Sequence, residues 1–263
     1  MTSTDNNWPV NWHVHRVLET GSTNTDLYAS ALAGAPSHSA LMADNQTAGR
    51  GRLDRTWEAK PGANLLLSLL FRIDHTVHKV HTHHAELKLW PRIVAIAAVH
   101  ACKQLIEQNH KSDSVTLKWP NDLLLDGRKL GGMLSVGDAQ QTFIVVGIGI
   151  NIGWAPPGSA ALMQVIPDAT PTPAELLKNI LLQIEILEKL NVDQQHQQYV
   201  ALLATLGKNV RVELTNGTFI TGRATELDTD GRLVVVEISD STIRHTFDTG
   251  DVVHLRDANH DYL

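Results

Sequence analysis

The chain of 263 residues contains a single cysteine, so it cannot form an internal disulfide bond. Cys102 lies in an apolar run, residues 93–106, where a buried structural thiol is favoured over a nucleophile because free cysteine is usually buried. The sequence has no uninterrupted run of about 18 apolar residues. Residues 1–10 lack the basic and apolar regions of a signal peptide. These absences predict a soluble protein of the reducing cytoplasm, with no membrane partner.

Positive charge is also scarce, because the chain has 22 Lys and Arg residues against 28 Asp and Glu residues, which gives a net charge of −6. A dedicated nucleic-acid binder normally carries a basic surface, so we expect no nucleic-acid partner. With 43% hydrophobic and 19% charged residues, the composition is that of a globular protein with room for one large and one small domain. Several arginines gather instead in one glycine-rich segment, residues 46–64, which we call the arginine loop.

Three arginines of this loop, Arg50, Arg52 and Arg55, alternate with glycines. Gly49 and Gly51 free the backbone to wrap a small ligand and to point amide N–H groups at it. Guanidinium is the side chain best matched to carboxylate or phosphate, so the loop is suited to collecting anions.

Two later segments repeat this theme, because each places a lysine beside a turn. They are residues 118–122 (Lys-Trp-Pro-Asn-Asp) and residues 128–132 (Arg-Lys-Leu-Gly-Gly). Two anions held by one basic site suggest activation of a carboxylate by a nucleotide. Residues 147–153 resemble a dinucleotide fingerprint, but Ile152 occupies a glycine position, so a Rossmann assignment is weak; a P-loop motif is absent from the sequence. These glycines fit tight strand packing and ligand contact equally well.

Apolar periodicity predicts alternating strands and helices over the first 206 residues. Residues 64–72 are apolar on both faces, which predicts a central strand. Pro91 is expected in the first turn of its helix, where proline is tolerated. The pair Asp126-Gly127 predicts a tight turn between two strands of a hairpin. We expect strands at residues 12–18, 41–44, 64–72, 115–119, 123–125, 129–136 and 142–152, and helices at residues 25–33, 91–108 and 174–190.

From Gly207 onward the apolar residues recur with a period of two, and no helical pattern longer than a turn follows. Asn216-Gly217 and Asp230-Gly231 are typical of type I′ turns. This pattern predicts a small barrel of about 50 residues. The whole chain is therefore predicted to be an α+β protein. The expected strands are residues 210–214, 218–224, 233–238 and 252–255, and the expected domains are residues 1–206 and 207–263.

Ordered motifs along the chain closely resemble the signatures of biotin protein ligases, and the resemblance spans roughly Trp12 to the C-terminus. It implies a mixed-sheet catalytic domain of the fold shared by class II aminoacyl-tRNA synthetases and biotin ligases, followed by an SH3-like barrel. The motifs are Asn-Gln-Thr-Ala-Gly-Arg-Gly-Arg at residues 45–52, then Trp57, Gly-Ala-Asn-Leu at residues 62–65, residues 118–122, Lys-Leu-Gly-Gly-Met-Leu at residues 129–134, and Gly-Ile-Gly-Ile-Asn at residues 147–151.

The resemblance implies a biotin–[biotin carboxyl-carrier protein] ligase. Biotin and ATP would give biotinyl-5′-AMP and pyrophosphate with Mg²⁺ as cofactor, and biotin would then pass to a lysine of the biotin carboxyl carrier protein domain of acetyl-CoA carboxylase. Members of the family often pair through their sheet, so a homodimer is one expected state. About eleven residues precede the first expected strand, too few for a helix-turn-helix domain, so a monofunctional enzyme is expected.

The resemblance also implies roles for single residues. A carboxylate and an α-phosphate held a few Å apart repel each other by about 4 kcal/mol at an effective dielectric near 20, so cations must cancel this repulsion. The implied catalytic residues are Arg52, Lys118 and Lys129. The implied biotin-binding residues are Ser22, Thr23, Asn24, Gln46, Gly49, Arg50, Gly51, Arg52, Lys129 and Gly132. The implied ATP or adenylate contacts are Arg52, Trp57, Lys118, Asn121, Asp122 and Asn151, and no protein ligand of a metal is assigned.

Several of these residues have a plain structural alternative. Ser22 and Thr23 fit a helix cap as well as a ligand contact. Trp57 is favoured as a packing residue over a ligand-covering one. Asp122 fits either a turn or a residue that orients ligand or metal. Gly131 stands where the family more often has alanine.

Five of the 14 histidines fall within ten residues, which superficially suggests a metal site. No cysteine or close pair of carboxylates completes a ligand set, so a solvated loop between a strand and a helix is the favoured interpretation. The histidines are His75, His78, His81, His83 and His84.

Two other functions stay open beside biotin ligation. A lipoate ligase would use the same chemistry on a different acid, although the arginine loop and residues 118–122 resemble the biotin branch. A noncatalytic biotin sensor would need a DNA-binding region. Leu53 and Asp54 replace the Arg and Gly residues more usual inside the arginine loop, which lowers its positive charge.

Overall fold

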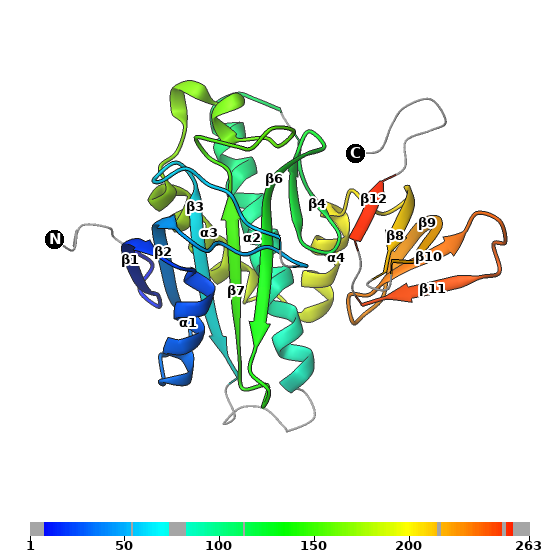
Figure 1. The fold of residues 1–263 in the computed structure, drawn as a ribbon, viewed down its shortest axis with the longest axis horizontal. Helices are drawn as coiled ribbons and strands as arrows, with labels where there is room; N and C mark the ends of the chain where they lie inside the picture. The colour runs from blue at the N-terminus through cyan, green and yellow to red at the C-terminus, as the bar shows by residue number, and fades with distance from the viewer. Residues whose placement is uncertain are drawn as a thin grey trace.

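A seven-stranded mixed sheet forms the centre of the protein, whose structure is a computed structural model (Figure 1). The structure describes residues 8–53, 55–73, 83–112, 114–214, 217–248 and 251–254. The strand order is β1-β2-β3-β7-β6-β5-β4, in which β1 and β2 are parallel and every other pair is antiparallel. The strands are β1 (His13–Thr20), β2 (Ser39–Gln46), β3 (Leu65–Arg72), β4 (Val115–Lys118), β5 (Asp122–Leu125), β6 (Arg128–Gly137) and β7 (Phe143–Ile150).

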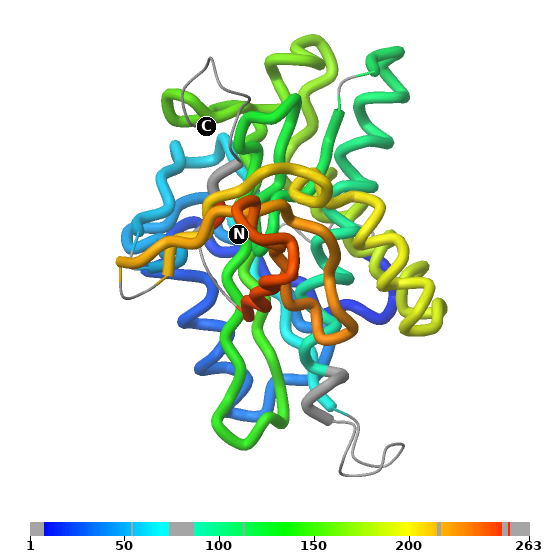
Figure 2. Tube along the Cα trace, turned by 90° about the vertical axis from the view of Figure 1, so that its right-hand side faces the viewer, coloured from blue at the N-terminus to red at the C-terminus, as the bar shows by residue number. Residues whose placement is uncertain are grey.

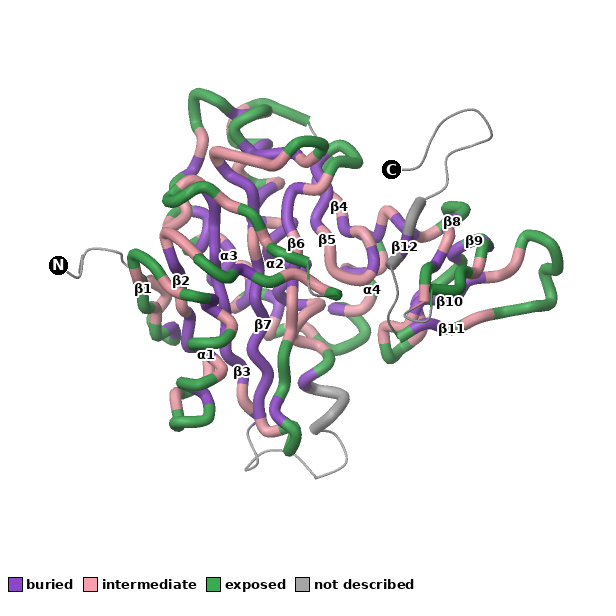
Figure 3. Tube along the Cα trace, viewed as in Figure 1, coloured by how far each residue is buried: buried purple, intermediate pink, exposed green. Residues whose placement is uncertain are grey.

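Strand β3 lies in the middle of the sheet, as its two-sided apolar pattern predicts, and its neighbour β7 is equally apolar. Figure 3 shows that buried residues concentrate along them. Helix α1 (Thr23–Leu32) covers one face, where Leu27 packs in a small cluster with Leu70 of β3. Helices α2 (His83–Gln108) and α3 (Pro173–Leu187) cover the other face and enclose the main core. The mixed-sheet architecture expected from the sequence is therefore confirmed.

Helix α2 corrects the expectation for Pro91, which lies inside the helix rather than in its first turn. The helix begins at His83, so His83 and His84 belong to it and not to a loop, while His75, His78 and His81 lie outside the described residues. A proline in a helix interior removes one backbone donor and crowds the carbonyl four residues earlier, but buried side chains on both sides of it, such as Leu87 and Ile93, extend the apolar face across it.

Helix α2 also bears on membrane insertion. Within the described residues it alone, over Leu87–Gln108, is long and apolar enough to cross a bilayer, but 56% of its apolar window is buried inside the protein. It packs on α3, α4 (Val192–Leu202) and the sheet, so it is a core helix.

Burial raises the pKa of Cys102 to about 12, which agrees with a structural thiol.

Helix α4 was not expected from the sequence, and α3 ends three residues earlier than expected. Helix α3 ends at Leu187, and α4 follows after Asn191, whose side chain accepts a hydrogen bond from the backbone N–H of Gln194. The Gln194 side chain in turn accepts from the backbone N–H of Asn191. This Asn-x-x-Gln spacing is a capping-box signature, and it could have predicted α4.

The C-terminal unit is a five-stranded antiparallel sheet in the order β11-β10-β9-β8-β12. It lies beside β4 and α4, and Figure 2 views the molecule from its side. The main hydrophobic cluster continues from the large sheet into this unit, where it includes Val210 and Leu233. The strands are β8 (Asn209–Glu213), β9 (Phe219–Leu227), β10 (Leu233–Glu237), β11 (Arg244–Phe247) and β12 (Asp251–His254); β11 was not expected from the sequence.

Turn geometry confirms one hairpin and corrects another. Asp126 and Gly127 both have a positive φ, at 47° and 78°, as a type I′ turn requires. In the pair Asp230-Gly231 only the glycine has a positive φ, so this turn is of a different type. Closure of the C-terminal sheet into a barrel stays a prediction.

Candidate active site

A cavity lies between the arginine loop, the start of α1 and strands β5, β6 and β7. We call it the main cavity. The predicted site residues on its wall are Ser22, Thr23, Asn24, Gln46, Arg50, Gly51, Arg52, Trp57, Asn121, Asp122, Lys129 and Gly132. Residues on the wall that were not predicted as site residues are Arg55, Thr56, Leu66, Leu67, Met133, Leu134, Gly147, Ile148 and Gly149.

One end of the cavity is a preorganised polar network at the start of α1. Gln46 Oε1 accepts hydrogen bonds from the Thr23 backbone N–H at 2.7 Å and from Thr23 Oγ1 at 3.0 Å. Ser68 Oγ lies 2.8 Å from Thr23 Oγ1 and 2.9 Å from Asn24 Oδ1. Asn24 Nδ2 donates to the carbonyl oxygen of Leu134 at 2.9 Å. These hydrogen bonds fix the positions of polar donors and acceptors at this end of the cavity.

The network settles part of the question about Ser22 and Thr23. Ser22 stands at the N-cap of α1, but its side chain makes no capping hydrogen bond, and Gln46 instead accepts from the Thr23 N–H.

Ser68, which supports this network, was not predicted from the sequence. It is the one hydroxyl in the otherwise apolar run from Leu65 to Phe71, and a buried polar residue in such a strand signals a partner.

The arginine loop folds back on itself beside the cavity. The Trp57 N–H donates to the Gly49 carbonyl at 3.0 Å, and the Gly51 N–H donates to the Arg55 carbonyl at 2.7 Å. Leu53, one of the departures from the family pattern, has a left-handed φ of 52°, while Asp54 lies outside the described residues. The loop is therefore a hairpin-like flap and not an open coil.

Arg52 joins the loop to the Lys-Trp-Pro-Asn-Asp turn. Its Nη1 donates to Asn121 Oδ1 at 3.1 Å. Asn121 Nδ2 donates to the Met133 carbonyl of β6 at 2.8 Å, and the Met133 N–H donates back to the Asn121 carbonyl at 2.9 Å. Asn121 thus connects the arginine loop to the sheet.

Trp57 is both a packing residue and a wall of the cavity. Its indole lies flat against β7, since a Cβ placed on Gly149 would stand 2.6 Å from Trp57 Cζ2. Its Nε1 is buried and has no hydrogen-bond partner among the described residues. The packing role favoured from the sequence is confirmed for Trp57, and Gly149 is tightly packed and lines the cavity; contact of either residue with a ligand stays a prediction.

Lys129 is held between a carboxylate and an aromatic ring. Its Nζ lies 2.7 Å from Asp122 Oδ1 and 5.9 Å from the centroid of the Trp57 ring. β5 and β6 create this geometry because Asp122 opens β5 and Lys129 follows the Asp126-Gly127 turn. Asp122 is therefore the ion-pair partner of Lys129. The two residues belong to different sequence motifs, so the sequence alone does not show that they pair.

Three predicted residues lie off the main wall. Gly49 is a buried residue of the arginine loop, and Lys118 ends β4; neither belongs to the residues that line the main cavity. Asn151 is buried, donates to the Ala160 carbonyl at 3.0 Å, and lines an adjoining cavity together with Trp57 and Lys129. The two cavities share Thr56, Trp57 and Lys129, so Asn151 lines a space that adjoins the main cavity.

Comparison with known proteins identifies the family of the chain. A model of the Biotin/lipoate A/B protein ligase family matches residues 18–152, and a model of the biotin protein ligase C-terminal domain matches residues 205–255. A biotin–[acetyl-CoA-carboxylase] ligase of Mycobacterium tuberculosis is 35% identical over 250 residues, which are 91% of this chain and 88% of that protein. The bifunctional ligase/repressor BirA of Bacillus subtilis is 30% identical over 84% of this chain and 68% of its own length.

Solved structures share the fold. The biotin protein ligase from Aquifex aeolicus in complex with biotin and ATP superposes with a TM-score of 0.71 at 23% identity, over 91% of this chain and 97% of that one. The biotin protein ligase from Leishmania major in complex with biotinyl-5-AMP superposes with a TM-score of 0.63 at 21% identity, over 90% and 99% of the two chains.

Proposed function

Because the chain belongs to the Biotin/lipoate A/B protein ligase family, we propose that it activates biotin with ATP and transfers the biotinyl group to a lysine of a biotin carboxyl carrier protein. The observation that carries this function is the main cavity, where a polar network and cationic side chains line the same space. Thr23, Asn24 and Gln46 form the polar end, and Arg52 and Lys129 supply the cations.

In the first step a biotin carboxylate oxygen bonds to the α-phosphorus of ATP, and the bond to the β-phosphate oxygen breaks to release pyrophosphate. We assign the ureido ring of biotin to the polar end, which offers fixed donors and acceptors. Lys129 then binds the biotin carboxylate, and Arg52 binds the phosphate region. Their charges offset the repulsion that otherwise keeps two anions apart.

In the second step the carrier lysine amine attacks the acyl carbon of biotinyl-5′-AMP. The new C–N bond forms as the C–O bond to AMP breaks, and the amine loses a proton. We place the adenine on the side of the adjoining cavity, against Trp57 and Asn151, because both cavities meet at the Trp57 ring. Lys118 stays assigned to the phosphate region and Gly49 to the loop over biotin, although neither residue lines the main cavity.

Magnesium would enter with the nucleotide. Among the described residues no group of three or more His, Cys, Asp and Glu side chains could hold a metal ion, and the Asp122 carboxylate is paired with Lys129. Mg²⁺ commonly binds through substrate phosphates with few protein ligands, so these residues fit a metal carried by ATP.

The test is a mass spectrum of the protein after incubation with ATP, Mg²⁺ and either biotin or lipoate. We expect retained biotinyl-5′-AMP and biotin-dependent release of pyrophosphate. Lipoyl-AMP instead would identify a lipoate ligase, and retained biotin without pyrophosphate would identify a noncatalytic sensor.

Two finer points stay proposals. The first is an SH3-like closure of the C-terminal unit, and the second is a homodimer formed through the sheet, which sedimentation of the full chain tests.

A further inference from the structure

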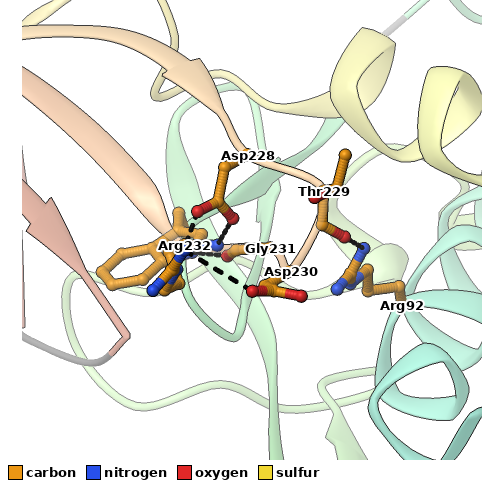
Figure 4. A network of polar contacts seen from close by, with 7 residues as sticks. Arg92, Asp228, Thr229, Asp230, Gly231 and Arg232 are labelled. Atoms are coloured by element: carbon orange, nitrogen blue, oxygen red, sulfur yellow. Dashed lines mark hydrogen bonds and ion pairs between the residues drawn. The ribbon is translucent and has the colours of Figure 1, made fainter. Parts of the chain in front are cut away.

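One turn of the C-terminal unit touches the large unit close to the main cavity. This C-terminal turn, residues 228–232, joins β9 to β10 (Figure 4). Its Gly231 carbonyl accepts a hydrogen bond from Trp119 Nε1 at 3.1 Å, and its Thr229 carbonyl accepts one from Arg92 Nη1 of α2 at 3.4 Å. Two residues of the large unit therefore anchor it.

The C-terminal turn is stiff where it meets the large unit. The Asp228 carboxylate accepts hydrogen bonds from the Arg232 backbone N–H at 2.8 Å and from Arg232 Nε at 2.7 Å. Gly231 has a φ of +86°, and a Cβ there would stand 2.7 Å from Arg92 Nη2. The positive φ favours glycine here, and an added methyl group would push the Arg92 guanidinium away from the turn.

Trp119 is fixed at its backbone as well as at its indole. Its N–H donates to Thr205 Oγ1 at 3.0 Å, and next to it the Ala204 N–H donates to the Leu117 carbonyl at 2.7 Å. Its side chain is only 3% exposed. The segment after α4 and the C-terminal turn thus hold Trp119 from two directions.

Two residues after Trp119 comes Asn121, whose Oδ1 accepts the hydrogen bond from Arg52. A short, continuous path therefore runs from the Gly231 carbonyl through Trp119 and Asn121 to a cation of the main cavity. The residues at the opposite, polar end are anchored separately, by α1, β2 and β3.

We propose that Trp119 is a positioning residue, through which the C-terminal turn sets Asn121 and hence Arg52 for the adenylation step. The inference rests on the proposed function. It predicts that loss of the indole donor lowers the rate of adenylation while leaving biotin binding intact, because the biotin end of the cavity does not depend on Trp119.

The first variant is Trp119→Phe in the full chain, which removes the indole N–H and keeps an aromatic ring. We expect kcat for biotin-dependent pyrophosphate release to fall about tenfold, equivalent to about 1.4 kcal/mol. The Kd for biotin measured by titration should stay within about twofold of the wild-type value. Trp12→Phe is the matched control, because the Trp12 Nε1 is buried without a hydrogen-bond partner, and its kcat should not change.

A second variant acts from the other side of the same contact and keeps Trp119. Gly231→Ala places a Cβ against Arg92 and strains the turn, so it should show the same selective loss of kcat. If Trp119→Phe does not fold, as judged by circular dichroism, Gly231→Ala decides the question alone. A wild-type kcat in folded Gly231→Ala protein overturns the proposal.

A double-mutant cycle separates positioning from general destabilisation. If Trp119 acts through Asn121, Asn121→Ala and Trp119→Phe/Asn121→Ala should have the same kcat, whereas a purely structural role predicts that the two losses multiply. Multiplied losses, or a kcat of Trp119→Phe equal to that of Trp12→Phe, would reject the inference. Failure of the proposed function looks different, because wild-type protein would then release no pyrophosphate in response to biotin.

Discussion

Lys129 shows how a single charge is aimed in this site. Its partner Asp122 and the ring of Trp57 hold the ammonium at the meeting point of two cavities. The Lys129 side chain is 42% exposed, and partly exposed ion pairs contribute little to the stability of a protein. The pair therefore matters for where the charge lies more than for the free energy of unfolding.

Lys129→Ala is expected to remove adenylate formation and to keep the fold. Loss of one contact made in the transition state costs about 3 kcal/mol, or a rate decrease on the order of 10²-fold. Biotin-dependent pyrophosphate release measures the effect, and thermal unfolding checks the fold. Lys60→Ala is the matched control, because Lys60 lies 5.6 Å above the ring of Trp154, outside the main cavity. Wild-type pyrophosphate release in Lys129→Ala would contradict the assigned role.

Gly149→Ala tests the packing of Trp57 on the sheet. The added methyl group would overlap the indole, so Trp57 must move and Lys129 loses its aromatic neighbour. We expect weaker ATP use and a lower unfolding temperature, since overpacking typically costs about 1–3 kcal/mol. Steady-state kinetics and calorimetry measure both. Gly137→Ala, at the far end of β6, makes only an ordinary contact and should change neither; equal effects of the two variants would argue against the packing described.

At the scale of elements, the arginine loop is a flap whose tip is joined to the sheet by a side chain. Arg52 joins it to Asn121, and the backbone bond between Trp57 and Gly49 closes its base. A flap of this kind can open for substrates and still shield a reactive intermediate from water.

Arg52→Gly is expected to loosen this flap and to release biotinyl-5′-AMP. The released intermediate should label an unrelated lysine-rich protein incubated with the variant, ATP and biotin, above the wild-type level. Arg128→Gly, an exposed arginine that bonds to Gln164 away from the main cavity, should label at the wild-type level. Labelling by Arg52→Gly that is no higher than this control would show that Arg52 does not retain the intermediate.

Helix α3 carries a prediction about pH. The backbone and side chain of Thr172 donate hydrogen bonds to Glu175 and hold the pKa of its carboxyl below the usual value. Since the pKa is lowered in the folded state, the stability that it contributes is present above the unfolded pKa of about 4.3 and is lost as the pH falls through the folded pKa.

Thr172→Ala should therefore lower the free energy of unfolding by about 1 kcal/mol near neutral pH and by less in acid. Urea denaturation at two pH values measures this. Asn191→Ala is the control, because its capping box on α4 uses Gln194, which does not titrate, so its loss should not depend on pH. The same pH dependence in both variants would contradict the prediction.

Elements with a strong local signal were predictable from the sequence, and those shaped by their surroundings were not. The two-sided apolar pattern of β3 predicted its central place, and the motifs identified most of the cavity wall. Pro91 misled because proline marks a helix start only when packing does not carry the helix across it. β11 begins with the polar residues Arg244 and His245 and depends on pairing with β10 for its conformation.

For the molecule as a whole, the two units share one hydrophobic cluster, yet the biotin end of the main cavity is built from the first unit alone. Truncation after Leu206 should therefore leave biotin binding measurable and weaken ATP use or transfer to the carrier, since the acceptor of Trp119 Nε1 is removed. Calorimetric titration with biotin and a transfer assay measure the two effects. Undiminished transfer would make the C-terminal unit dispensable, and lost biotin binding would make it part of the core fold.

The unpartnered indole of Trp57 gives the protein an optical reporter of its own. Indole emission depends on the polarity around the ring, and this ring forms a wall of the main cavity while a lysine ammonium lies over it. A ligand that fills the cavity replaces water beside the Trp57 ring. The carboxylate of biotin would also draw the Lys129 ammonium toward itself. Occupancy should therefore be readable as a change in intrinsic fluorescence, and Trp57→Phe identifies the part of the signal that comes from this one of six tryptophans.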